Sequence, residues 1–360
     1  MEHFIRDLHI QNFKSLKDIQ MDCRRINLIV GRPNVGKSNI LEALSLFCAP
    51  FSEDKEKFLS EFVRYNEIDE LFFDQNITDS VLVKANKNCC SVTSFQHFFL
   101  LSIGNQYLTT KFLEKTSEIT ISRLLSFIWE GEEQITEEQL KRFVHYAVEN
   151  NGKKLIKGNK NIIDFNIRRY EFKTPLFKGD NGEFLSIPFG ENLFSSVLRN
   201  RALKEEIANW LKEYKLELVI DKRSKNLSVQ KREGNVVYPI SYNLIADTLQ
   251  RMIFHYAAIM SNKDSILLFE EPESHSYPPY IYELANKIIE DENNNQFFIT
   301  THSPYLFNTI VERTPKEELS VFIASYENYQ TQLQQLTEKD LSELIDYGID
   351  IFFNQKYFAK

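Results

Sequence analysis

The sequence predicts an α/β fold with a mixed sheet and a largely helical insertion, and three observations support this class. The glycine-rich stretch GRPNVGKS, at residues 31–38, stands between an alternating strand pattern and an amphipathic helix pattern. A strand, helix, strand pattern follows at residues 265–302, and such units build parallel sheets. Between them, residues 98–210 show irregular helical spacing and many aromatic residues.

Composition bounds the class of protein. The chain has 360 residues, of which 42% are hydrophobic and 26% charged, so it can bury a large core. It has no apolar run of membrane-spanning length and no secretory leader pattern, so we expect a cytoplasmic, soluble protein. The four cysteines form no CxxC pair, which indicates neither a zinc site nor a disulfide framework.

The elements around the glycine-rich stretch follow from residue periodicity. Alternation predicts strands over Phe4–Ile10, Arg25–Val30 and Ser80–Asn86, the second of which leads into the stretch. Four apolar side chains then recur on one helical face, so the stretch opens a helix: Ile40, Leu41, Leu44 and Phe47. This order of strand, loop and helix is the one that a phosphate-binding loop requires.

The second half of the chain also alternates between strands and helices. Two strands joined by a turn at 233–235 precede a helix over 241–259, with Ser241 or Asn243 as its N-cap and Leu244 on its apolar face. Strands at 265–271 and 296–302 then flank the helix 280–292. A strand at 319–325 and a helix at 337–353 follow.

The glycine-rich stretch has the residue types of a phosphate site. Gly31 and Gly36 let the backbone curl its N–H groups around an anion, and Lys37 adds a positive charge. Ser38 can ligate magnesium, and the following helix adds the positive end of its dipole. A plain structural turn is the alternative, but its position between a strand and a helix favours nucleotide binding.

Two later stretches place polar side chains at the ends of the predicted parallel strands. In ILLFEEPESHSYP, Glu270 can hold a magnesium-bound water and Glu271 can polarise an attacking water, whereas the alternative is a solvated acidic turn. In FFITTHSPYL, His302 can donate a hydrogen bond to a phosphate or to water. Single histidines are more often structural, and only its position favours a functional role.

These three pieces together resemble the ABC-type ATPase heads of the RecF, SMC, Rad50 and OLD group, in particular the stand-alone AAA15-type ATPases. The resemblance covers about residues 8–47 and 238–307. It implies an ABC-ATPase-like P-loop fold with the insertion between Walker A and Walker B. The segments would be 1–97 and 211–360 for the two halves of one head, and 98–210 for the insertion.

The resemblance also implies roles for individual residues and the cofactors ATP and Mg²⁺. Glu271 would be the catalytic base, His302 the switch histidine, and Glu270 the Walker B carboxylate. Ser38, Glu270 and, more loosely, Gln75 as the Q-loop glutamine would serve the metal. The nucleotide would be contacted by Lys14, Gly31, Asn34, Gly36, Lys37, Ser38 and Asn39.

Two departures from the family pattern predict slow hydrolysis. Ala246 and Thr248 stand where relatives carry a signature Ser and Gly that reach the partner's γ-phosphate, unless Ser241 or Asn243 substitutes. Glu270 replaces the usual Asp, which moves the carboxylate by one methylene group. A displacement of that size can cost on the order of 10²-fold in rate.

The resemblance implies a switch in which ATP joins two heads as a homodimer or higher oligomer and hydrolysis releases them. Residues 303–360 are too few for the nuclease domain of OLD-type relatives, so we expect a separate nuclease or toxin-like effector, as in anti-phage defence. Two alternatives stay open. One is a DNA-repair or chromosome-associated ATPase, and the other is a nucleotide-binding scaffold with negligible hydrolysis.

Contact with nucleic acid is left open by the charge pattern. The net charge is −8, which argues against a protein that coats nucleic acid. Two basic stretches, KKLIKGNK at 153–160 and DKRSKNLSVQKR at 221–232, could meet phosphates. Because acidic residues flank both and no aromatic pattern accompanies them, we interpret them as solvated loops.

Overall fold

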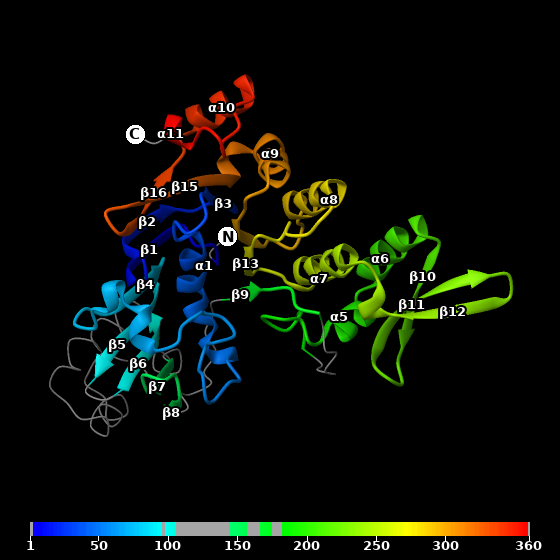
Figure 1. Cartoon of the computed structure of the whole chain (residues 1–360), viewed down its shortest axis with the longest axis horizontal. Helices are drawn as coiled ribbons and strands as arrows, with labels where there is room; N and C mark the ends of the chain where they lie inside the picture. Colours follow the sequence, from blue (N-terminus) through cyan, green and yellow to red (C-terminus); the bar gives the residue numbers. More distant parts are fainter. Residues whose placement is uncertain (1–2, 96–97, 106–143, 157–165, 175–181, 359–360) are drawn as a thin grey trace. The chain divides into compact units, whose positions relative to one another are not determined.

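The computed structural model describes residues 3–95, 98–105, 144–156, 166–174 and 182–358 (Figure 1). The chain forms two compact units. The first comprises Met1–Ile167, Ser320–Thr337 and Gln355–Lys360, and the second comprises Arg168–Leu319 and Glu338–Asn354. The expected α/β class is confirmed, whereas the division into segments at 97 and 210 stays a prediction.

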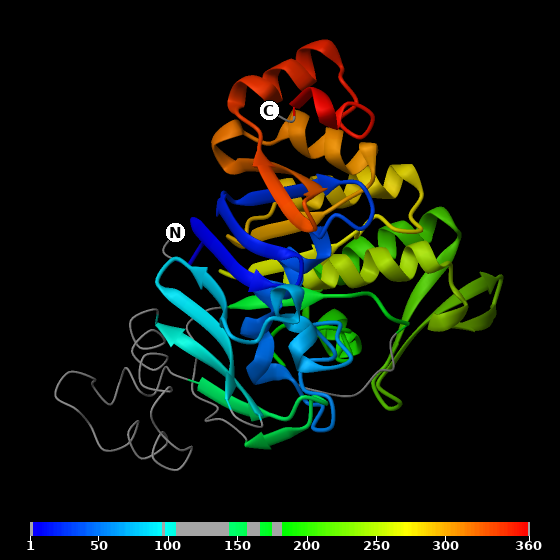
Figure 2. The ribbon, with the colours of Figure 1, turned by 60° about the vertical axis from the view of Figure 1, so that its left-hand side comes forward.

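A seven-stranded antiparallel sheet occupies the first unit, in the order β2-β1-β4-β5-β6-β7-β8 (Figure 2). Alternating burial along its first strand places Leu8, Ile10 and Phe13 in the core. The strands are β1 Asp7–Phe13, β2 Leu16–Asp22, β4 Val81–Ala85, β5 Asn88–Phe95, β6 Phe98–Asn105, β7 Val144–Val148 and β8 Lys154–Ile156.

The glycine-rich loop lies in the same unit, after the fully buried strand β3, Ile26–Gly31. Helix α1, Lys37–Ser45, begins directly after the loop and buries Ile40, Leu41 and Leu44. Strand β15, Leu319–Glu327, lies between β3 and the antiparallel β16, Gln330–Gln335. Short helical turns complete the unit at Leu46–Phe51, Ile68–Leu71, Phe73–Gln75 and Gln355–Phe358.

The second unit carries a parallel strand pair. Strand β13, Ile266–Glu270, pairs in register with β14, Gln296–Thr300, and β9, Ile167–Tyr170, lies beside β13. Both strands of the parallel pair are apolar and buried, as expected for strands covered on both faces. The accompanying helices are α7 Asp247–Ser261, α8 Pro278–Ile289, α9 Pro304–Arg313 and α10 Glu338–Tyr347, with a 3₁₀ turn at Lys316–Glu318.

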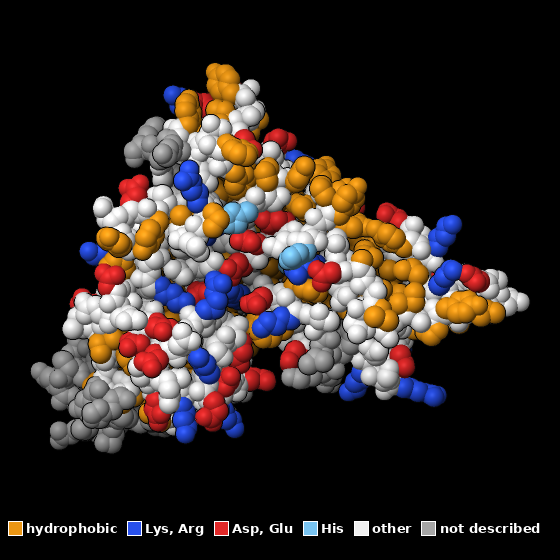
Figure 3. Space-filling view, viewed as in Figure 1, with side chains coloured by type: hydrophobic (Ala, Val, Ile, Leu, Met, Phe, Trp, Pro, Cys, Tyr) orange, Lys and Arg blue, Asp and Glu red, His pale blue; other side chains and the backbone are white. Residues whose placement is uncertain are grey.

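A three-stranded antiparallel sheet in the second unit follows two helices, α5 Leu193–Arg199 and α6 Arg201–Glu213. The side chain of Asn200 caps α6 by accepting a hydrogen bond from the Leu203 N–H. The strands are β10 Leu216–Asp221, β11 Asn226–Glu233 and β12 Val236–Ser241. Figure 3 shows hydrophobic side chains on this sheet, and Val236, Val237 and Tyr238 of β12 are exposed.

The segment 98–210 combines strands with helices in its described residues. Its helical content lies in α5 and α6, at the end of the segment, whereas β6, β7, β8 and β9 precede them. The run FFLL at the start of β6 is continuously apolar, and periodicity does not distinguish such a run from a buried helix. Residues 106–143, within the expected insertion, lie outside the described part of the chain.

Helix α7 begins later than the sequence predicted. Its first residue is Asp247, after a 3₁₀ turn at Tyr242–Leu244 and the extended residue Ile245. The predicted caps Ser241 and Asn243 are therefore wrong, and Leu244 is 73% exposed instead of buried. The apolar spacing from Leu249 onward is strictly helical, but Leu244 fits that spacing by coincidence.

All four cysteines are buried free thiols, as predicted. In the described residues, no helix has both the length and the apolar character of a membrane span.

Candidate functional site

Backbone packing against β15 and β16 shapes the glycine-rich loop of the first unit. A Cβ atom at Gly31 would lie 2.4 Å from the carbonyl oxygen of Ala324. At Gly36, which has φ = 93°, a Cβ atom would lie 2.1 Å from Thr331 Oγ1 and 2.6 Å from Ser15 Oγ. Both positions therefore require glycine for steric reasons, and Gly36 also for its left-handed backbone.

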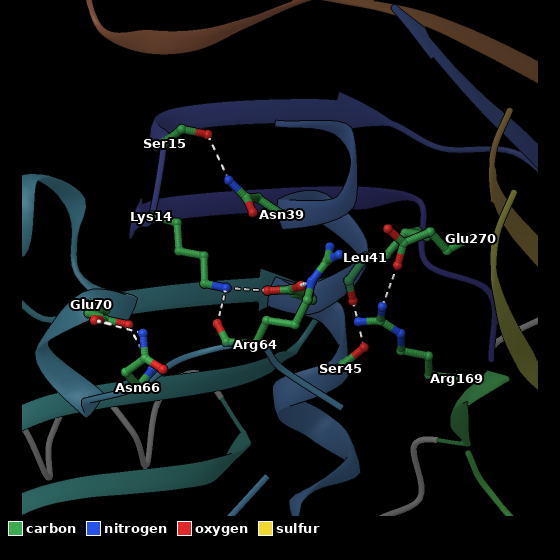
Figure 4. A network of polar contacts seen from close by, with 11 residues as sticks. Lys14, Ser15, Asn39, Leu41, Ser45, Arg64, Asn66, Glu70, Arg169 and Glu270 are labelled. Atoms are coloured by element: carbon green, nitrogen blue, oxygen red, sulfur yellow. Dashed lines mark hydrogen bonds and ion pairs between the residues drawn. The ribbon is translucent and has the colours of Figure 1, made fainter. Parts of the chain in front are cut away.

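A chain of hydrogen bonds through Ser15 and Thr331 joins the loop to the turn after β1 and to β16. Ser15 Oγ and Thr331 Oγ1 are 2.6 Å apart, and Thr331 Oγ1 donates to the carbonyl oxygen of Val35 at 2.9 Å. Asn39 Nδ2 donates to Ser15 Oγ at 2.8 Å, as Figure 4 shows. The predicted residue Asn39 thus joins the first turn of α1 to the turn after β1. Sequence reasoning missed Ser15 and Thr331, since the latter lies far along the chain.

The predicted phosphate ligands lie in this loop and in the first turn of α1. Lys37 is 5% exposed, and its Nζ donates to the carbonyl oxygens of Gly31 and Arg32 at 2.9 and 2.8 Å. These two hydrogen bonds hold the ammonium group of Lys37 against the backbone of the loop. Ser38 is half-buried in the first turn of α1, and Asn34 is exposed at the tip of the loop with φ = 60°.

Lys14 belongs to a buried ion cluster in the first unit. Its Nζ contacts Glu42, a fully buried carboxylate on α1, and Arg64 Nε contacts the other Glu42 oxygen at 2.6 Å (Figure 4). The two cations offset the charge of Glu42, which lies in the second half of α1. Gln75, the candidate Q-loop residue, is exposed at the end of a short 3₁₀ turn, with φ = 54°. The roles of Lys14 and Gln75 at a nucleotide stay predictions.

In the second unit, Glu270 ends strand β13 and forms an ion pair with Arg169 of β9 (Figure 4). The Arg169 side chain is 4% exposed and that of Glu270 is 22% exposed, so the pair lies at the edge of the core. A buried guanidinium beside a carboxylate compensates the cost of burying both charges. Sequence reasoning missed Arg169 because nothing in NIRRYEF distinguishes it from a surface arginine.

Glu271 and His302 face each other across the ends of β13 and β14. His302 Nε2 lies 3.3 Å from Glu271 Oε1, and the two side chains are 34% and 41% exposed. Glu271 has φ = 44°, and its N–H donates to the Thr300 carbonyl oxygen at 3.0 Å. The left-handed backbone turns the Glu271 side chain away from the direction of the strand, and the bond to β14 holds that turn.

Glu273 connects the segment that follows β13 to the segment that follows β14. It is 7% exposed, and its Oε1 accepts hydrogen bonds from the Thr301 hydroxyl at 2.6 Å and from the His302 N–H at 3.0 Å. A third hydrogen bond comes from the Ser303 N–H at 3.2 Å. Burial raises the pKa of the Glu273 carboxyl, and the hydrogen bonds from Thr301 and His302 oppose that rise.

The predicted site residues therefore form two groups. The first unit holds Lys14, Gly31, Asn34, Gly36, Lys37, Ser38, Asn39 and Gln75, and the second holds Glu270, Glu271 and His302. Within the second unit, the structure brings together Glu271 and His302, which the sequence placed at the ends of separate strands. That both groups act on one nucleotide stays a prediction.

The start of α7 differs from a phosphate-reaching helix. Its N-cap is Ala246, which offers no side-chain hydrogen bond, and its first residue is the acidic Asp247. Thr248 Oγ1 donates to the His275 carbonyl oxygen at 3.1 Å, so this hydroxyl is engaged within the chain. A carboxylate at a helix N-terminus lowers the attraction of that terminus for an anion.

The residue types present fit a nucleotide with magnesium. Gly31 and Gly36 allow the loop to pack directly against Ala324 and Thr331. The loop also leads into the N-terminus of α1, which favours an anion such as phosphate. Across the described ranges, no group of three or more His, Cys, Asp or Glu residues could hold a metal by itself. Nucleotide-bound magnesium takes only one or two protein ligands besides phosphate oxygens and water, and the hydroxyl of Ser38 and the carboxylate of Glu270 are each a suitable ligand type.

The basic stretches are largely paired or outside the described residues. In the second stretch, Arg232 Nε lies 2.9 Å from Glu217, and Lys231 pairs with Glu233. In the first stretch, Lys154 lies over the ring of Phe58, whereas residues 157–160 are outside the described ranges. Residues 226–232 of the second stretch belong to strand β11 and not to a loop. Contact with nucleic acid stays a prediction.

A family model and a curated relative are similar to this chain. A family model described as "AAA domain, putative AbiEii toxin, Type IV TA system" matches residues 99–308, which include Glu270, Glu271 and His302. The chain is 19% identical over 316 residues to an ATP/GTP phosphatase of Helicobacter pylori, covering 83% of this chain and 85% of that protein.

Solved structures similar to the chain include two heads of SMC proteins. One is an SMC head bound to the C-terminal winged-helix domain of ScpA, at 15% identity and a TM-score of 0.49, covering 93% of this chain and 99% of the other. The other is the SMC head domain from Thermotoga maritima, at 14% identity and a TM-score of 0.42, with the same coverage.

Proposed function

The chain belongs to the AAA domain family whose model spans residues 99–308, and from that premise we propose that it is an ATP-hydrolysing molecular switch. One observation carries the proposal. Glu271 and His302, at the ends of two parallel strands, lie 3.3 Å apart, where a carboxylate and an imidazole can together handle the proton of an attacking water. The similarity to an ATP/GTP phosphatase supports the same class of reaction.

In this proposal the first unit grips the phosphates. Lys37 Nζ, now bonded to two loop carbonyl oxygens, turns to the β- and γ-phosphate oxygens, and the loop N–H groups between Gly31 and Gly36 bind the remaining charge. Asn34 and Asn39 border the same loop. The hydrogen-bond chain through Ser15 and Thr331 keeps the loop in shape before the ligand arrives, which lowers the entropic cost of binding.

The second unit supplies the groups for hydrolysis in this proposal. Glu271 accepts the proton of the attacking water, and His302 donates to the developing charge on the phosphate. Glu270 and Ser38 hold magnesium, which when bound neutralises charge on the phosphate oxygens. Arg169 orients Glu270 and reduces its negative charge, which supports slow hydrolysis.

The output proposed is an ATP-dependent homodimer of heads that controls a separate effector. The family description names a putative toxin of a type IV toxin–antitoxin system. In our proposal the effector is a separate nuclease or toxin-like protein and the system serves defence. A second candidate is a nucleotide-binding scaffold with negligible turnover. Asp247 and the engaged hydroxyl of Thr248 favour it, because they weaken the helix terminus that would reach the partner's phosphate.

Phosphate release by the parent protein and by Glu271→Gln tests the proposal. We expect magnesium-dependent release by the parent and a fall of about 10²- to 10⁴-fold in the variant, because the amide cannot take the proton. The control is Glu312→Gln, an exposed glutamate on α9 that should leave the rate unchanged. Light scattering should show ATP-dependent dimers that persist in Glu271→Gln. Equal, negligible release by parent and variant would favour the scaffold.

A further inference from the structure

Glu273 is a buried carboxylate to which neither the sequence motifs nor the proposed reaction assign a role. It lies two residues after Glu271, in the segment that leaves β13, and its hydrogen-bond donors all lie in the segment that leaves β14. The side chain therefore spans the two segments that carry Glu271 and His302.

The bonding of Glu273 is concentrated on one oxygen. Oε1 accepts hydrogen bonds from the Thr301 hydroxyl, the His302 N–H and the Ser303 N–H. Oε2 is buried and has no hydrogen-bond partner among the described residues. An acceptor that binds two successive backbone N–H groups fixes the direction of the chain at that point, because both donors must point at one atom.

The same loop is restrained on its other side. The Glu271 N–H is bonded to Thr300, and Thr248 at the start of α7 holds the His275 carbonyl oxygen at 3.1 Å. Glu271 and His275 have φ values of 44° and 59°, so the segment between them is a tight turn with two left-handed residues. Glu273 is the side chain of this turn that bonds to the histidine segment.

We propose that Glu273 is a positioning residue that sets the separation of Glu271 and His302 by holding the His302 backbone on Oε1. The inference rests on the proposed hydrolysis, since it assigns a purpose to the geometry of that same pair. A buried carboxylate is expensive to keep in a core, and three donors on one oxygen offset that cost here. Glu273 acts through His302 and does not touch the nucleotide.

A comparison of Glu273→Ala with Glu273→Gln tests the proposal. Alanine removes the acceptor, so we expect kcat to fall on the order of 10²-fold, as for a displacement of about 1 Å at the reacting groups. The KM for ATP should stay within about twofold, because the phosphate grip is built elsewhere. Glutamine keeps an oxygen for the three donors, so kcat should remain within about threefold of the parent.

Two further measurements keep the test decisive. Thr301→Val changes the shape little but removes one donor to Glu273 and the Oγ1 acceptor of the Ser303 N–H. We expect kcat to fall about threefold to tenfold with an unchanged KM. Hydrogen exchange of the His302 and Ser303 N–H groups should accelerate in Glu273→Ala but not in Glu273→Gln. If Glu273→Ala does not fold, Glu273→Gln and Thr301→Val carry the test.

Three outcomes would overturn the inference while leaving the proposed function intact. They are a parental kcat in Glu273→Ala, a parental kcat in Thr301→Val where alanine does not fold, and a loss in Glu273→Gln as large as in Glu273→Ala. A rise in KM that accounts for the whole loss would show a structural role instead. Failure of the proposed function is a different result, because the parent protein itself would then release no phosphate.

Discussion

The glycine-rich loop and the Glu271–His302 pair are built in opposite ways. The loop is eight consecutive residues whose shape is set by the backbone, with Gly31 and Gly36 pressed against strands that allow no side chain. The pair joins residues from the ends of two strands, and side-chain hydrogen bonds to Glu273 hold one of its members. The loop requires that Gly31 and Gly36 have no side chain. The pair requires the carboxylate of Glu273, which binds the His302 N–H.

This difference determines how each region responds to change. A backbone cradle fails when any side chain is added, since nothing around it can yield without breaking the Ser15–Thr331 hydrogen bond. The Glu271–His302 pair should instead be displaced gradually, in proportion to the number of hydrogen bonds to Glu273 that are lost. The predictions below test this contrast, from the largest expected effect to the smallest.

The largest effect is expected for Gly36→Ala. The new methyl group would overlap Thr331 Oγ1 and occupy a left-handed backbone position, so we expect a loss of about 2 to 4 kcal/mol in the free energy of unfolding. Nucleotide affinity should fall at least about 100-fold, because the loop can no longer close around a phosphate. Denaturant unfolding and equilibrium nucleotide binding would measure the two effects.

Gly234→Ala is the matched control. Gly234 has φ = 59° but no atom within 4 Å of a Cβ placed there. It should lose only the conformational part, about 1 kcal/mol, with normal nucleotide affinity. Equal losses of unfolding free energy in both variants would show that backbone conformation alone, and not contact with β16, makes glycine necessary at position 36.

The middle effect concerns Arg169. Removing its guanidinium leaves Glu270 with its full negative charge, so Arg169→Ala should lower the magnesium concentration for half-maximal phosphate release by about three- to tenfold. Arg168→Ala is the control, because Arg168 lies on the same strand and donates to Asn262. If Arg169→Ala instead needs a higher magnesium concentration for half-maximal phosphate release, Arg169 orients Glu270 and does not weaken its binding of magnesium.

The smallest effect is a pH dependence of stability at Glu273. Its pKa is raised by burial and by the charge of Glu271, above the value of about 4.3 in an unfolded chain. The protonated carboxyl therefore contributes stability that is complete below that value and is lost as the pH rises through the folded pKa. Denaturant unfolding should show the parent losing stability relative to Glu273→Gln over this range. A difference independent of pH would contradict the raised pKa.

The elements that the sequence predicted well are those with one clear period. The strand, helix, strand unit that ends in Glu271 and His302 follows from two buried apolar runs with an amphipathic helix between them. The glutamine-rich strand β16 and the start of α7 were missed or misplaced. In β16, QTQLQQ has no apolar alternation, and its pairing with β15 decides its conformation.

The site was predictable where chemistry follows local order and not where it depends on distant packing. Lys37 and Ser38 are defined by their own loop, and Glu271 by the strand before it. Arg169 and Glu273 were missed because each acts through a partner distant in the sequence. Arg169 pairs with Glu270, 101 residues away, and Glu273 binds Thr301, 28 residues away. A buried carboxylate in a turn has no sequence signal that separates it from a solvated one.

We propose that the glycine-rich loop and the Glu271–His302 pair serve a single nucleotide. The most direct measurement is the identity of the nucleotide retained after incubation with magnesium and ATP, followed by removal of free ligand. We predict ADP on the parent protein, intact ATP on Glu271→Gln and no nucleotide on Lys37→Ala. ADP on Glu271→Gln at the parental level would contradict the claim.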